Sequence, residues 1–228
     1  MPESETSPSE AIPDRGSPMP GCAILVTILT VFGGLVLLYT FVGIYQYRTI
    51  GTFTEDTPSE IAAPSPSPAE TEAALAKLHL IEKAVKEERS ERVLFTASDL
   101  NTLISTLEAA KDFRGNTRIE KIGPEGIVAR MTQPLRKGPF QKGFRYLNGT
   151  FVFQPDLRVR TIAFRVVSIL PAKGSVPEDF VKSYAILDLF RLDPENPAMK
   201  THAPWLTAVY TEEGQLVVET GSSPREDT

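Results

Sequence analysis

Cysteine and histidine are nearly missing from this chain of 228 residues, which holds one cysteine and two histidines. With Cys22 alone, no disulfide can form within the chain and no zinc site can be built from cysteine pairs. A lipoprotein is excluded as well, because the lipidated cysteine of a lipoprotein follows the apolar stretch of its signal, whereas Cys22 precedes the main apolar run. His79 and His202 stand in no metal-ligand spacing, so we expect no metal site.

The familiar catalytic and nucleotide-binding motifs are missing as well. The sequence contains no GxSxG elbow, no HExxH, no Walker loop and no GxGxxG fingerprint. Paired carboxylates are recognised by their separation in space, which a sequence hides. Glu178 and Asp179 have an ordinary explanation as favourable charge at a helix N-terminus. We therefore expect no catalytic residue, no cofactor and no enzyme, and an enzyme built on a carboxylate pair stays open as an alternative.

One long apolar run is present, from about residue 22 to residue 45. At about 1.5 Å per residue, some 25 helical residues reach roughly 37 Å, enough to cross a hydrocarbon core of ~30 Å with tilt. Tyr39, Tyr45 and Tyr47 gather toward its C-terminal end, as expected of an interfacial aromatic belt. The run predicts a single-pass transmembrane helix, and a cleaved signal peptide is the alternative.

The orientation of this helix is not decided by the positive-inside rule, since Arg15 and Arg48 balance each other. A short tail, one apolar helix and a large following domain form the layout of a signal anchor. We therefore expect a cell-membrane protein whose C-terminal domain lies outside the cytoplasm.

Two segments beside the run lack the apolar residues needed for packing. Residues 1–20 are rich in Pro, Ser and Glu, and residues 64–68 read PSPSP, which favours extended polyproline geometry. We expect a disordered tail over residues 1–20, the membrane helix over 21–47 and a semi-rigid spacer over 48–69. A globular domain over 70–221 and a disordered tail over 222–228 complete the organisation.

The domain begins with two predicted helices. In residues 69–91, Ala74, Leu78, Ile81 and Val85 recur at helical spacing. The second helix starts at Thr96 as N-cap, with Asp99 at the capping-box position. Its apolar stripe consists of Leu100, Leu103, Ile104 and Leu107, and we assign that stripe to the core rather than to a ligand groove.

Alternating segments follow and predict a β-meander. Ile127, Ala129 and Met131 share one face of a candidate strand. We interpret residues 143–153 as one strand that turns at residues 154–156, because the apolar stretch over 157–170 needs a long partner. A hairpin turn at Asn148 and Gly149 is the alternative.

A third helix is predicted after Gly174, where Ser175 and Glu178 are spaced as a capping box and Pro177 lies in the first turn. Its apolar face carries Phe180, Val181, Tyr184 and Leu187, and it should stop near Asp193. A hairpin over residues 205–210 and 215–220 closes the chain. Helices packed on an antiparallel sheet give the fold class α+β.

Charge is segregated along the domain. Residues 111–173 hold 13 Lys and Arg against 4 Asp and Glu, a net of +9, whereas residues 174–228 hold 4 against 10, a net of −6. The basic strands suit contact with an anionic surface, and the candidate contact residues are Lys142, Arg145, Arg158 and Arg160. Arginines that cover apolar surface with their stems are the alternative explanation.

The layout resembles known proteins. An anchor helix, a short linker and the segments LFTASDLNTLI (residues 94–104), RYLNGTF (145–151) and SVPEDFV (175–181) look like a group of uncharacterised bacterial single-pass membrane-anchored proteins. The element order is also distantly similar to anchored bacterial envelope domains proposed to bind lipids in a curved sheet wrapped on a helix. This resemblance implies lipid binding and no catalytic residues.

Three functions therefore stay open. The first is a membrane-anchored, non-catalytic envelope domain that binds a lipid, an anionic polymer or a partner protein. The second is a structural interaction module that docks on another membrane protein, and the third is the carboxylate-dependent enzyme. We expect the bilayer as a partner and no nucleic acid.

Overall fold

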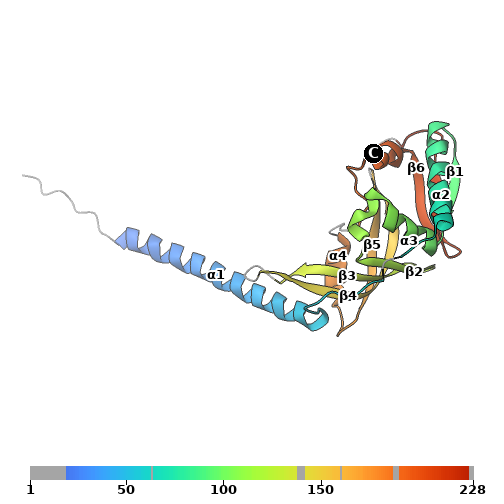
Figure 1. Ribbon diagram of the computed structural model, residues 1–228. Helices are drawn as coiled ribbons and strands as arrows, with labels where there is room; N and C mark the ends of the chain where they lie inside the picture. The colour runs from blue at the N-terminus through green and yellow to red at the C-terminus, as the bar shows by residue number, and fades with distance from the viewer. Residues whose placement is uncertain (1–18, 63, 138–141, 160, 187–189, 226–228) are drawn as a thin grey trace, which may run out of the picture. The chain divides into compact units, whose positions relative to one another are not determined.

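The N-terminal apolar segment forms one long helix, α1 (Met19–Phe53), in the computed structural model (Figure 1). The structure describes residues 19–62, 64–137, 142–159, 161–186 and 190–225. Two compact units divide the chain, Met1–Tyr45 and Gln46–Thr228. In the first unit the large apolar side chains of α1 are exposed, for example Phe32 at 67%. The helix is thus long and apolar enough to cross a membrane, which is compatible with a single-pass anchor or with a signal sequence.

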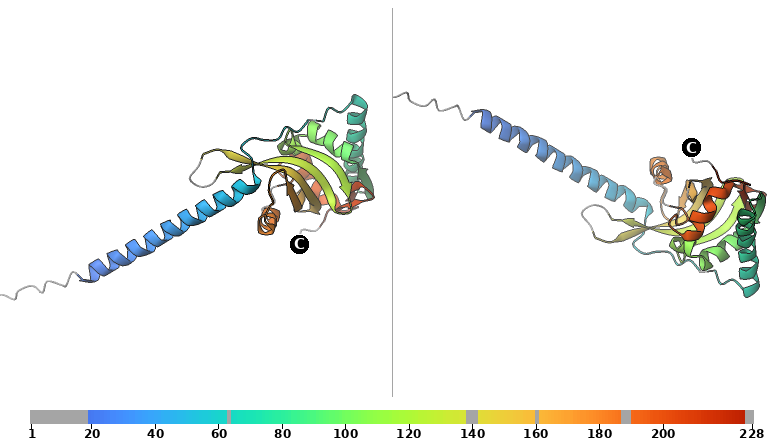
Figure 2. Two further views of the ribbon diagram at one scale, coloured as in Figure 1. Left: turned by 90° about the horizontal axis from the view of Figure 1, so that it is seen from below. Right: turned by 90° about the horizontal axis from the view of Figure 1, so that it is seen from above.

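The second unit is α+β, as expected, with helices packed on antiparallel sheets. One sheet has the strand order β1-β7-β6 and the other the order β2-β3-β4-β5, and Figure 2 shows the second sheet curving. The strands are β1 (Glu91–Phe95), β2 (Thr117–Gly123), β3 (Gly126–Arg136), β4 (Phe144–Leu157), β5 (Ile162–Pro171), β6 (Leu206–Glu212) and β7 (Gln215–Thr220). The helical elements are α2 (Pro68–Lys86), α3 (Ala97–Thr106), η1 (Glu108–Phe113), α4 (Glu178–Ile186), α5 (Pro197–His202) and η2 (Ala203–Trp205).

Both N-terminal helices of this unit start at capping boxes. Ser67 and Glu70 cap α2, and Thr96 and Asp99 cap α3 as predicted, with each side chain bonded to the other residue's backbone. Burial alone would raise the pKa of Asp99, but hydrogen bonds from Lys77 and Thr96 outweigh it and hold the pKa below its usual value.

Strand β1 was not expected: the predicted helix over residues 69–91 included its first residue, and residues 92–95 were assigned to no element. It pairs over its whole length with β7, from Glu91 opposite Thr220 to Phe95 opposite Leu216. This pairing joins segments about 125 residues apart in the sequence. A local pattern in the five residues of β1 does not reveal such a distant partner. The closing hairpin itself is confirmed, with a two-residue turn in which Glu213 and Gly214 have φ of 48° and 79°, as a type I′ turn requires.

The alternative turn at Asn148 is wrong, because Asn148 lies in the middle of β4. The predicted turn at residues 154–156 is also misplaced, since β4 continues to Leu157 and pairs with β5 through that residue. Gly149 is required where it stands. A Cβ atom there would come 2.3 Å from the carbonyl oxygen of Leu170 on β5.

Aromatic rings extend the core toward the end of α1. Phe53 is 1% exposed and meets Phe180 of α4 edge-on, with ring centroids 5.0 Å apart. Phe180 stacks on Tyr184 at 4.9 Å, and Tyr184 lies 6.1 Å from Phe190. Burial raises the pKa of Tyr184 to about 12, so its hydroxyl stays neutral. Helix α4 ends at Ile186 and is shorter than expected. Its predicted apolar face is confirmed for Tyr184, which is buried. Leu187 lies outside the described residues.

Candidate functional site

An apolar cavity of about 380 Å³ lies between the two sheets. Each of the seven strands contributes at least one residue to its lining, and so do α2, α3, η1 and α5. Apolar side chains dominate, including Leu78, Ile104, Met131, Phe153 and Leu206. Volumes of roughly 300–1,000 Å³ are typical of ligand pockets, and a dominant apolar pocket with a few polar groups is the default candidate site.

The stripe of α3 that the sequence assigned to the core has a second role. Leu103 is buried at 7%, but Leu100, Ile104 and Leu107 are only partly buried, and all four line the cavity. The helical spacing correctly placed these side chains on one face. It carried no information on whether the opposite sheet would close against that face or leave a space.

Polar side chains lie at the edge of the cavity. Glu82 of α2, Glu108 of η1 and Ala198 of α5 are exposed and also line it, so the cavity reaches solvent between these three elements. The other polar side chains in the lining are Asn196 and His202, which are of intermediate exposure, and Thr117, which is buried. The lining includes no lysine or arginine among the residues that the structure describes.

The volume limits what the cavity can hold. An apolar cavity of ~150 Å³ takes up benzene with its six carbons, so about 380 Å³ suits roughly 15 carbon atoms by proportion. One alkyl chain fits this volume, whereas the two chains of a phospholipid exceed it. The geometry therefore favours a slender apolar molecule that enters by one end.

A second feature is the segment after α1, residues 54–59, which we call the strap. It was expected to be part of a spacer over residues 48–69, but α1 continues to Phe53 and the strap is bound to the edge of β4. Glu55 and Tyr146 exchange two backbone hydrogen bonds of 2.9 and 2.7 Å. The spacer expectation is corrected here, because buried Phe53, Thr54 and Ile61 make this stretch part of the folded unit.

Asn148 is the main anchor of the strap. Its side chain is 2% exposed, and its oxygen accepts hydrogen bonds from the Ser59 amide at 3.0 Å and the Thr132 hydroxyl at 2.6 Å. Its amide nitrogen donates to the Glu55 carboxylate and, at 3.0 Å, to the Thr57 carbonyl. All four hydrogen-bonding positions of this buried amide, two acceptors and two donors, are thus used, which fixes the strap in place.

The predicted basic contact residues differ in exposure and in bonding. Arg145 is used by the strap, donating to Thr54 at 2.7 and 2.8 Å and pairing with Asp56 at 2.8 Å. Arg158 is exposed and pairs with Asp156 at 3.0 Å. Lys142 is exposed, and Arg160 lies outside the described residues. Part of the +9 net charge of residues 111–173 is therefore neutralised by ion pairs within the folded unit.

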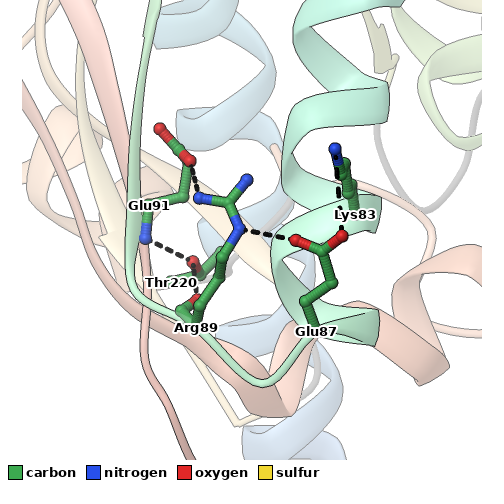
Figure 3. A network of polar contacts seen from close by, with 5 residues as sticks. All are labelled: Lys83, Glu87, Arg89, Glu91 and Thr220. Carbon is green, nitrogen blue, oxygen red and sulfur yellow. Dashed lines mark hydrogen bonds and ion pairs between the residues drawn. The ribbon is translucent and has the colours of Figure 1, made fainter.

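A third polar cluster joins α2 to the three-stranded sheet (Figure 3). Arg89 bonds the carboxylates of Glu87 and Glu91, and the Thr220 hydroxyl accepts from the Glu91 amide at 2.9 Å and donates to the Arg89 carbonyl at 3.1 Å. Lys83 pairs with Glu87 at 3.8 Å. These contacts fasten the α2–β1 turn to β7, which is a structural role.

Nothing in the described part of the chain gathers three or more His, Cys, Asp or Glu side chains in a way that would hold a metal ion. Comparison with protein-family models, with curated proteins and with solved structures finds no match. The cavity and the apolar helix are therefore the features of the described residues that indicate a function.

Proposed function

We propose that this protein is a membrane-anchored domain that binds the apolar chain of a lipid between its two sheets. The observation that carries the proposal is the cavity of about 380 Å³, which is lined almost wholly by apolar side chains and reaches solvent beside Glu82, Glu108 and Ala198. Each methylene moved from water into such a space contributes about 0.8 kcal/mol, so a chain of ten or more carbons binds strongly without polar contacts.

The apolar helix supports the same proposal. The large apolar side chains of residues 24–45 are exposed along α1, far more apolar surface than a protein in water normally leaves uncovered. A bilayer would cover that surface, and its lipids would be the source of the proposed ligand. We propose that α1 is the anchor and that the folded unit stands outside the cytoplasm.

Mass spectrometry of the full chain after gentle extraction from its membrane tests lipid binding. Wild type should carry a copurified lipid in near-stoichiometric amount. Ile104→Trp places a larger side chain in the cavity and should remove that lipid, whereas Leu80→Trp on the exposed side of α2 should not. A stoichiometric protein partner in place of any lipid would instead favour the docking module.

Ala198→Trp gives a second way to block the site. Ala198 is exposed at the edge of the cavity, so a larger side chain there can be accommodated without disturbing the core. It should lower the bound lipid while leaving the thermal unfolding of the protein unchanged. Full lipid occupancy in both tryptophan variants, or none in wild type, would overturn the proposed function.

The orientation has a separate test. Ser222 is exposed near the end of the last strand, and Cys22 is the one natural cysteine. In a Cys22→Ser background, Ser222→Cys should react with a membrane-impermeant maleimide in intact cells. Reaction only after lysis would place the folded unit in the cytoplasm.

We also propose that the folded unit contacts an anionic surface. Lys142 and Arg158 are exposed and remain candidates for it. Exchange of both residues for Gln should weaken binding of the folded unit to anionic vesicles in a salt-dependent way.

A further inference from the structure

We infer that the cavity selects a single-chain lipid with an uncharged, hydroxyl-bearing head group, such as a fatty alcohol or a monoacylglycerol, over a fatty acid with an ionised carboxylate. The inference rests on the proposed function and adds the chemical class of the ligand. Its basis is the charge of the side chains where the cavity meets solvent.

The ionised groups that line the cavity are both acidic. Glu82 and Glu108 are exposed carboxylates at its edge, and no lysine or arginine is in the described lining. An anionic head group placed there would lose hydration and meet like charge, with no cation in the lining to compensate it. An ionised fatty acid is therefore disfavoured at this edge.

The basic side chains close to the edge are already engaged. Lys111 pairs with Glu108 at 3.3 Å, and His79 contacts Glu82 at 2.9 Å. Arg114 donates to the carbonyls of Ile104 and Leu107 at 3.3 and 2.9 Å, at the C-terminal end of α3. These three side chains are held by residues beside the cavity and none of them is in its lining, so they do not form a carboxylate-binding group within it.

The same edge suits a hydroxyl donor. A carboxylate accepts hydrogen bonds from alcohol groups, and such charge-assisted bonds are stronger than neutral ones. Glu82 and Glu108 come from different elements, α2 and η1, and Asn196 and His202 add further polar groups to the lining. A head group with one or two hydroxyls can bond there while its single chain occupies the apolar space.

The experiment is a displacement titration on the full chain, delipidated and held in a polymer belt so that free detergent does not compete. A neutral apolar fluorophore, 1-N-phenylnaphthylamine, reports occupancy of the cavity. Oleyl alcohol, monoolein and oleate share one chain length and differ in the head group. They are compared at a mildly alkaline pH, where the free carboxylate is ionised.

We expect oleyl alcohol and monoolein to displace the fluorophore at concentrations at least about tenfold lower than oleate, a factor worth about 1.4 kcal/mol. The double exchange Glu82→Gln and Glu108→Gln should bring oleate close to the neutral ligands. The matched control, Glu125→Gln with Glu178→Gln, removes two exposed carboxylates elsewhere and should leave the preference unchanged.

Each outcome separates the inference from the proposed function. If none of the three ligands displaces the fluorophore, or if the fluorophore does not bind, the proposed function fails. If oleate displaces it as well as the neutral ligands do, lipid binding stands and the selectivity is refuted. If the preference persists in the Glu82 and Glu108 variant, the two carboxylates do not determine it, and the inference is again overturned.

Discussion

Replacement of Asn148 by Ala should release the strap and destabilise the folded unit. The side chain makes four hydrogen bonds, to Glu55, Thr57, Ser59 and Thr132, and is 2% exposed. A typical net contribution is about 1 kcal/mol per bond, and unpaired buried groups cost more. Since the strap can regain water once it detaches, we expect a loss of roughly 2–4 kcal/mol in the free energy of unfolding.

The assay combines stability with local exchange on the full chain in detergent. Urea unfolding followed by the fluorescence of Trp205, the sole tryptophan, gives the free energy of unfolding. Hydrogen exchange reports the strap itself, because the amides of Glu55 and Ser59 are both bonded in wild type. Both amides should exchange faster in the variant, well before global unfolding.

A matched control is Asn101→Ala, which removes two hydrogen bonds of 2.8 Å between α3 and the backbone of Ile119. It should cost about 1–2 kcal/mol without changing exchange in the strap. Wild-type exchange at Ser59 in Asn148→Ala, together with a stability loss no larger than the control's, would refute the account of Asn148 as the anchor.

A charge variant at the same position gives a pH dependence. Asn148→Asp replaces the donor to Glu55 by a second carboxylate, so burial and like charge raise the pKa of the new group in the folded state. A raised folded-state pKa means that the variant binds a proton more tightly when folded, and its stability should rise as the pH falls toward ~4. A variant whose deficit relative to wild type stays constant with pH would contradict this.

Three further predictions follow from the fold. A chain that starts at Glu70 should be less stable and more prone to aggregate than one that starts at Gln46, because it lacks the buried residues Phe53, Thr54 and Ile61. Equal midpoints of urea unfolding for the two chains would show that the strap does not stabilise the folded unit. Gly149→Ala should cost about 1–3 kcal/mol because its Cβ meets the neighbouring strand's carbonyl, whereas Gly51→Ala, with open space around it, should not destabilise. Because the pKa of Asp99 is lowered by folding, its contribution is present above the unfolded value of ~3.9 and is lost in acid, so Asp99→Asn should reduce the stability difference between neutral and acid solution.

The sequence predicted the elements whose signals are local. The capping box at Thr96 and Asp99 fixed the start of α3, and the apolar run identified α1, because caps and long apolar stretches act over a few residues. The class α+β followed from the order of such elements. Trp205, the last residue of η2, is of intermediate exposure and packs against the core.

What the sequence missed depends on pairing across long separations. The Asn148–Gly149 dipeptide is a hairpin signal in isolation, yet here Asn148 serves as a buried anchor for a segment 89–93 residues earlier. The cavity was missed for the same reason. Whether the stripe of α3 meets the opposite sheet or faces a space depends on how two sheets from distant segments come together, and no local pattern records that.

The bond between the strap and Asn148 also orders events during synthesis. The strap leaves the ribosome about 90 residues before its anchor, directly behind the apolar helix α1. Until β4 is made, the strap lacks Tyr146 and Asn148 as hydrogen-bond partners, and residues 144–148 of β4 are not paired with β5. Docking of the strap is therefore a late, long-range step, and it covers the edge of β4 around Tyr146 only after β4 has been synthesised.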